Sequence, residues 1–167
     1  NAFKVPLKRN CRNTAIILDK IKLATGADAG VSGAGAGPEI TERYAVEVGD
    51  VARIVAEEIH RIVQHGGLSE SEVTILSNAI DESTLLEHLP KTLANKIVRL
   101  DEFSMQTFPP DGISLSAIGS FKGLENEAII VVGLPEQLGH PETQALAYVA
   151  MSRARSILSI VYLPDVG

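Results

Sequence analysis

The 167-residue sequence contains no tryptophan, a single cysteine and no apolar run long enough to cross a bilayer. With Cys11 as the lone thiol, an internal disulfide is excluded, and the four histidines do not lie with it at any metal-ligand spacing. The start of the chain also lacks the layout of a signal peptide. We therefore expect a cytoplasmic protein with no membrane span and no metal site of its own.

The chain is also short of positive charge, with 15 Lys and Arg against 21 Asp and Glu, a net charge of -6 and a pI near 5.2. Phosphate neutralisation by basic side chains dominates nucleic-acid affinity, so this balance argues against a dedicated nucleic-acid-binding module and allows only a few contacts to a nucleic-acid backbone. The length and the 45% hydrophobic content suit one globular domain, residues 1–167. Because no initiator methionine is present, we expect this domain to be a fragment of a longer protein.

Large apolar residues are scarce between about residues 25 and 38, where Gly, Ala and Ser dominate. This composition predicts a flexible loop. A phosphate-binding role for its GAGAG stretch, residues 33–37, would require a strand before it and a helix after it, whereas a helix is predicted before it. The whole sequence also lacks the Walker A pattern G-x-x-x-x-G-K-[ST].

The hydrophobic pattern alternates between strand and helix periods along the rest of the chain. Runs of apolar residues, and their alternation with polar ones, predict strands at residues 5–7, 44–48, 73–76, 97–100, 115–118, 128–132 and 157–162. They predict helices after Asn13 or Thr14, after Gly49-Asp50 up to Gly66-Gly67, at 81–89 and at 142–153. The run at 128–132 is apolar on both faces, as a central parallel strand requires. The order indicates an α/β fold with a mostly parallel sheet flanked by helices.

Two polar segments stand out against this apolar framework. The loop SFKGLE, residues 120–125, follows a predicted strand at its carboxyl end, where open α/β sheets place ligand sites, although an ordinary turn with Glu125 paired to Lys122 explains it equally. Arg153 and Arg155 end a largely apolar helix. They either complement the helix dipole, for about 0.3–1 kcal/mol each, or reach a phosphate at a domain edge.

Three segments resemble motifs of the UvrD/Rep-type, superfamily-one DNA helicases, in their carboxyl-terminal RecA-like domain. Residues 7–14, LKRNCRNT, are similar to motif IV, L-x-x-N-Y-R-S-T. Residues 117–125, AIGSFKGLE, are similar to motif V, T-x-H-x-x-K-G-L-E. Residues 146–155, LAYVAMSRAR, are similar to motif VI, L-x-Y-V-A-x-T-R-A-R. The resemblance spans nearly the whole chain and implies a RecA-like, P-loop-NTPase-type fold without its own Walker A loop.

The resemblance also implies roles for individual residues. Arg12 would reach the γ-phosphate of ATP and Arg153 would be the arginine finger, a residue worth about a thousandfold or more in rate. Glu125 would accept a hydrogen bond from the ribose, with Gly123 letting the backbone approach. Ser120 would lie on the strand-binding side. Tyr148 is assigned instead to the core.

Cofactor and partners follow from the same resemblance. ATP with Mg²⁺ is the implied cofactor, with the metal ligands supplied by an N-terminal RecA-like lobe that is the first partner. Single-stranded DNA is the second, RNA remaining open. The isolated fragment is predicted to be inactive, and DNA repair is the process that the family suggests.

The sequence departs from the family at three positions. Cys11 stands where the family has a tyrosine that stacks on adenine, a contact worth about 0.5–1.5 kcal/mol. Ala117 and Gly119 replace the Thr and His of motif V, which couple nucleotide state to the bound strand. These changes support an alternative function, a non-catalytic RecA-like interaction or regulatory domain that has lost motor coupling. An unrelated small α/β binding domain would require all three matches to be accidental.

Overall fold

The computed structural model describes residues 13–25, 39–121 and 123–164. Its six strands are β1 (Thr41–Tyr44), β2 (Val73–Ser77), β3 (Ile97–Arg99), β4 (Ile113–Ala117), β5 (Asn126–Leu134) and β6 (Ala154–Tyr162). Its α-helices are α2 (Ala15–Thr25), α3 (Val48–His60), α4 (Glu82–His88), α5 (Lys91–Ala94), α6 (Glu102–Gln106) and α7 (Pro141–Ser152). A π-helical turn, η1 (Arg61–His65), extends α3, and two 3-10 turns are η2 (Glu70–Glu72) and η3 (Ile118–Ser120).

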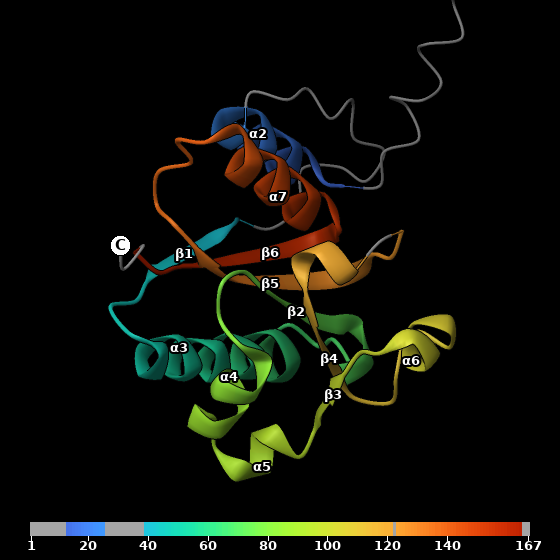
Figure 1. Ribbon diagram of the computed structural model, residues 1–167. Coiled ribbons are helices and arrows are strands. Elements are labelled where there is room, and N and C mark those ends of the chain that lie inside the picture. Colours follow the sequence, from blue (N-terminus) through green and yellow to red (C-terminus); the bar gives the residue numbers. More distant parts are fainter. Residues whose placement is uncertain (1–12, 26–38, 122, 165–167) are drawn as a thin grey trace, which may run out of the picture.

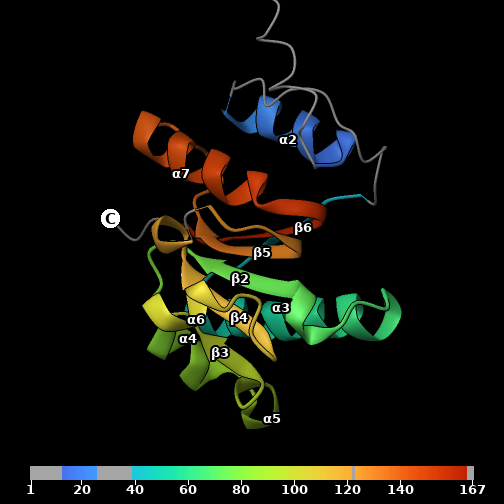
Figure 2. The same cartoon turned by 90° about the vertical axis from the view of Figure 1, so that its right-hand side faces the viewer.

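The strands form one sheet in the order β1-β6-β5-β2-β4-β3, and every pairing is parallel. Parallel strands need crossover connections, so helices cover both faces. Helices α2 and α7 lie on one face and α3, α4 and α5 on the other (Figures 1 and 2). The predicted α/β class with a mostly parallel sheet flanked by helices is confirmed.

The sheet separates two hydrophobic clusters. One lies between the sheet and α3 and α4, and includes Val55, Ile75 and Leu85. The other lies beneath α2 and α7, and includes Ile17, Ile129 and Phe121. Strand β5 contributes side chains to both clusters because it is buried on both faces, as the apolar run at residues 128–132 predicts.

The element boundaries follow local capping chemistry. Helix α3 begins at Val48 because Glu47 and Asp50 form a capping box. Residues 45–47 therefore form the turn into the helix, and β1 ends at Tyr44. The predicted strand at 44–48 is wrong in its bounds. The predicted helix after Asn13 or Thr14 is confirmed as α2, and the predicted helix at 81–89 is confirmed as α4 with Asp81 as its N-cap. The predicted strand at 5–7 and the loop after Thr25 lie outside the described residues.

Candidate functional site

The junction between α7 and β6 is the centre of the candidate site. Arg153 caps the carboxyl end of α7, and its backbone N–H donates to the carbonyl of Ala150 at 3.3 Å. Its own carbonyl accepts a hydrogen bond from the backbone N–H of Asn126, the first residue of β5, at 3.0 Å. The backbone of Arg153 is therefore fixed by both the helix and the neighbouring strand.

The side chain of Arg153 is half-buried, and its Nε atom is buried without a hydrogen-bond partner among the described residues. A buried polar group is normally hydrogen-bonded, because desolvating it without compensation costs about 1–3 kcal/mol. Arg153 Nε is one of two such buried side-chain atoms among the described residues, the other being Thr14 Oγ1.

The end of the motif IV segment docks onto this junction. The side-chain amide of Asn13 donates to the carbonyl of Ser152 at 2.9 Å and also to the carbonyl of Ala154. The backbone N–H of Thr14 donates to the carbonyl of Arg155 at 3.1 Å. The first and last of the three motif segments, far apart in sequence, are thus joined by hydrogen bonds, and the helices that follow and precede them, α2 and α7, lie side by side (Figure 1). Arg12, the residue before Asn13, lies outside the described residues.

The end of motif V reaches the same place. Glu125 directly precedes β5, and its carboxylate accepts a hydrogen bond from Arg155 Nε at 2.9 Å. Arg155 Nη1 lies 3.5 Å from a carboxylate oxygen of Glu127. The turn before Glu125 contains Gly123 at φ +73°, a left-handed conformation that favours glycine. Glu125 is thus paired with an arginine of motif VI, while the side chain of Lys122 lies outside the described residues.

A cavity of about 610 Å³ opens beside this carboxylate. It is lined by Phe108, Pro109, Gly123, Leu124, Glu125, Asn126 and Arg155. Its walls combine an aromatic ring, aliphatic groups and one ion pair.

Segment 120–125 lies between two strands, as predicted, but only its beginning is at the carboxyl end of a strand. Ser120 ends η3, just after the carboxyl end of β4, and is exposed. Phe121 is buried on the α2 and α7 side of the sheet, and the chain returns across that face to the amino end of β5. Because β4 and β5 run parallel, the chain has to pass from the carboxyl end of β4 to the amino end of β5. Ser120 and Glu125 therefore lie at opposite ends of the strands, on opposite edges of the sheet.

Two further expectations change. Tyr148, assigned to the core, is 36% exposed, because the buried face of α7 carries Ala147, Ala150 and Met151 instead. The apolar character of the motif did not reveal which face turns inward. Sequence reasoning did not place Asn13 at the site, and it gave Arg155 no partner within the chain. Their place in the segments that resemble motifs IV and VI was the available signal, but their partners depend on contacts between distant segments.

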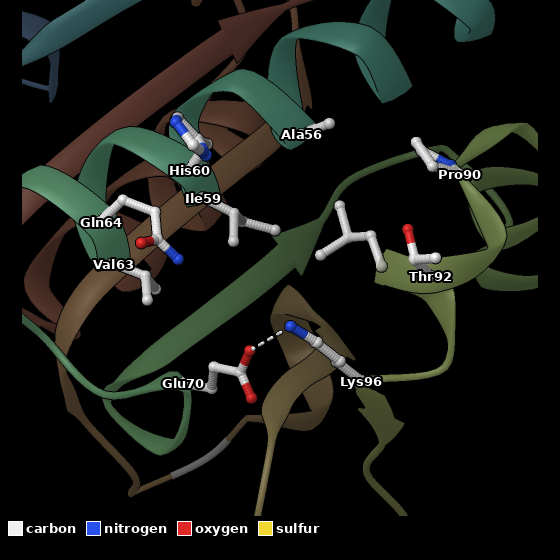
Figure 3. Close-up of a pocket in the computed structure, with 10 residues that line it drawn as sticks. Ala56, Ile59, His60, Val63, Gln64, Glu70, Pro90, Thr92 and Lys96 are labelled. Carbon is white, nitrogen blue, oxygen red and sulfur yellow. Dashed lines mark ion pairs between the residues drawn. The ribbon is translucent and has the colours of Figure 1, made fainter.

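A second cavity, of about 240 Å³, lies on the other face of the sheet between α3 and the α5 region (Figure 3). Glu70 and Lys96 form an ion pair of 3.2 Å at one side of it, and Ile59 and Val63 form part of its apolar wall. None of the described motif residues lines this cavity, so it is separate from the candidate site.

Within the part of the chain that the structure describes, no group of three or more His, Cys, Asp or Glu side chains is placed to hold a metal ion. In the same residues, no helix has the length and apolar character of a membrane span.

No protein-family model matches the chain, and no curated protein matches it. Among solved structures, the chain is similar to the C-terminal domain of a possible DNA helicase from Lactobacillus plantarum WCFS1, with a TM-score of 0.66 and 15% sequence identity. That match covers 92% of this chain and 88% of the other. The C-terminal part of the Fun30 ATPase domain gives a TM-score of 0.41 at 16% identity, over 66% of this chain and 39% of the other.

The match to the possible DNA helicase concerns the fold. The chain has an α/β fold with a six-stranded, all-parallel sheet flanked by helices, and this architecture resembles a helicase C-terminal domain. A fold alone does not determine an activity, which has to be argued from the site.

Proposed function

We propose that this chain is the C-terminal motor lobe of an ATP-dependent DNA helicase or translocase of the UvrD/Rep type, and part of a longer protein. The observation that carries the proposal is the meeting of the three motif segments at one sheet edge, where Asn13, Glu125 and Arg153 come together. The segments resembling motifs IV and V, residues 7–14 and 117–125, are far apart in the sequence. Their meeting in the fold therefore supports a shared role.

In this proposal the edge completes an ATP site in the cleft between two lobes. Arg153 acts as the arginine finger, and Arg12 contacts the γ-phosphate. An arginine that stabilises charge on the transferred phosphoryl group accelerates hydrolysis by about a thousandfold or more.

Glu125 accepts a hydrogen bond from the ribose, and Gly123 in its left-handed conformation allows the turn to pass close to the nucleotide. Mg²⁺, when bound, neutralises charge on the phosphates. We expect the metal ligands and the Walker A loop to come from the N-terminal lobe, and this lobe alone to be inactive.

Ser120 faces single-stranded nucleic acid at the opposite edge, where β4 ends. Closure of the two lobes on ATP and reopening after hydrolysis would then move the strand relative to this edge. The net charge of -6 limits this lobe to a few backbone contacts, so the basic groove belongs to the rest of the protein. Single-stranded DNA is the expected nucleic-acid substrate, and single-stranded RNA is the substrate to compare with it.

The test is ATP hydrolysis by the full-length protein, with and without single-stranded DNA, for wild type and Arg153→Ala. We expect DNA to stimulate hydrolysis and the substitution to abolish it, with the circular dichroism spectrum unchanged. Arg53→Ala is the matched control, because Arg53 lies on α3, on the other face of the sheet from α7 (Figure 1), and forms exposed ion pairs with Asp50 and Glu57.

Hydrolysis that is absent from the wild type, or that survives Arg153→Ala, would overturn the motor assignment. A non-catalytic interaction or regulatory domain would then be the better description, as the Ala117 and Gly119 departures from motif V suggest.

A further inference from the structure

A β-bulge lies where the candidate site meets the sheet. Asn126 pairs with Ala154, but two residues later Ala128 pairs with Ile157, which is three residues after Ala154. Strand β6 therefore carries one extra residue, and Glu127 of β5 faces both Arg155 and Ser156. Bulges of this kind redirect side chains and are common beside active sites.

The bulge gives Arg155 two carboxylates to contact. Its Nε donates to Glu125 at 2.9 Å, and its Nη1 lies 3.5 Å from Glu127. The other carboxylate oxygen of Glu127 accepts a hydrogen bond from Ser156 Oγ at 2.9 Å. Glu127 is thus held from two sides and anchors the planar guanidinium, whose fork of donors has a fixed geometry.

This arrangement contributes little to folding. The side chains of Arg155 and Glu125 are 37% and 35% exposed, and ion pairs of that exposure contribute little to stability in water. What the arrangement does fix is the direction of the Glu125 carboxylate at the rim of the cavity beside Phe108 and Pro109. Arg155 bonds one oxygen of the Glu125 carboxylate, and because a carboxylate accepts up to about four hydrogen bonds, a ribose hydroxyl can donate to the same group.

We propose that Arg155, anchored by Glu127, is a positioning residue that orients the Glu125 carboxylate toward the ribose hydroxyls of the nucleotide and so sets the selectivity of the site for ribose. The inference rests on the proposed function, because it takes Glu125 as the ribose contact. Arg155 does not itself act on the phosphates, which distinguishes it from Arg153.

The test uses steady-state hydrolysis by the full-length protein, with ATP and with 2′,3′-dideoxy-ATP as substrates. For Arg155→Gln we expect the KM for ATP to rise about tenfold with kcat little changed, because a charge-assisted hydrogen bond to the substrate is lost from ground and transition state alike. The KM for dideoxy-ATP should stay at its wild-type value, since that substrate has no hydroxyl for Glu125 to bind.

Three further variants complete the test, and the last of them is a control. Glu125→Gln should show the same loss of discrimination between the two substrates. Glu127→Gln leaves Arg155 in place but loosens it, so it should give a smaller change in the same direction, and it carries the test if Arg155→Gln does not fold. Arg99→Gln, which breaks an exposed Arg–Glu pair elsewhere, should behave as wild type.

The possible failures are distinguishable. An active wild type whose discrimination between ATP and dideoxy-ATP is unaffected by Arg155→Gln and Glu127→Gln overturns the positioning role and leaves the proposed function standing. An equal rise in KM for both substrates also overturns it, because the effect then does not pass through the ribose. A wild type without hydrolysis overturns both proposals.

Discussion

The side-chain amide of Asn13 donates a hydrogen bond to the backbone carbonyl of Ser152 at 2.9 Å, across 139 positions of sequence. The same amide bonds the carbonyl of Ala154, so one buried side chain satisfies two carbonyls at the turn from α7 into β6. Helix ends leave carbonyls without intrahelical partners. Asn13 therefore has a structural task that is separate from any contact made by Arg12.

Removing that amide should destabilise the fold. We expect Asn13→Ala to lower the free energy of unfolding by about 1–3 kcal/mol, because buried carbonyls lose their donor. The measurement is urea unfolding followed by circular dichroism. Asn95→Ala is the control, since Asn95 is exposed and its change should stay within about 0.5 kcal/mol. Equal losses in the two variants would contradict a special role for Asn13.

Gly133 near the end of β5 is expected to tolerate no side chain. A Cβ atom there would lie 1.9 Å from the carbonyl oxygen of Asn78, and φ is +90°. We expect Gly133→Ala to cost about 3 kcal/mol or more, because backbone has to move as well as adopt a strained conformation. Gly67→Ala, at φ +76° with open space around it, should cost only about 1–2 kcal/mol. Comparable unfolding midpoints for the two variants would refute the steric argument.

Tyr162 should make the fold sensitive to alkaline pH. Burial, the hydrogen bond that its hydroxyl donates to Glu42 at 2.6 Å, and nearby negative charge raise the pKa of Tyr162 well above its ordinary value of 10.0. A raised pKa in the fold means that the stabilisation is complete below pH 10.0 and is lost as pH rises above it. Urea unfolding at a series of pH values should show a steeper alkaline loss for wild type than for Tyr162→Phe. Tyr148→Phe should retain the wild-type slope.

Glu42 should contribute at the acid end. Burial raises the pKa of Glu42, but hydrogen bonds from Lys20 and Tyr162 and the charge of Lys20 together lower it below 4.5. Its stabilisation is therefore present above pH 4.5 and is lost as pH falls through the lowered value. We expect Glu42→Gln to flatten the acid limb of the stability curve. An acid limb identical to that of wild type would show that the pair with Lys20 has no energetic role.

Much of the fold was predictable because its signals are local. The apolar run at 128–132, the helical period after Gly49-Asp50 and the capping residue Asp81 each indicate structure within a few residues of themselves. Errors arose where capping chemistry competed with strand period, as at residues 44–48. The outward position of Tyr148 was missed because a helix with apolar residues on several sides does not reveal which side packs against the sheet.

The amino-acid sequence by itself determined the α/β class, the order of most elements and the identity of the residues in the three motif segments, since periodicity, capping and residue type are properties of neighbouring positions. Only the tertiary structure decided that Ser120 and Glu125 lie at opposite edges of the sheet, that Asn13 docks onto the turn before β6 and that Arg155 faces Glu125. These relationships depend on strand order, on register and on one bulge, and those are set by hydrogen bonding and packing between segments far apart in the chain.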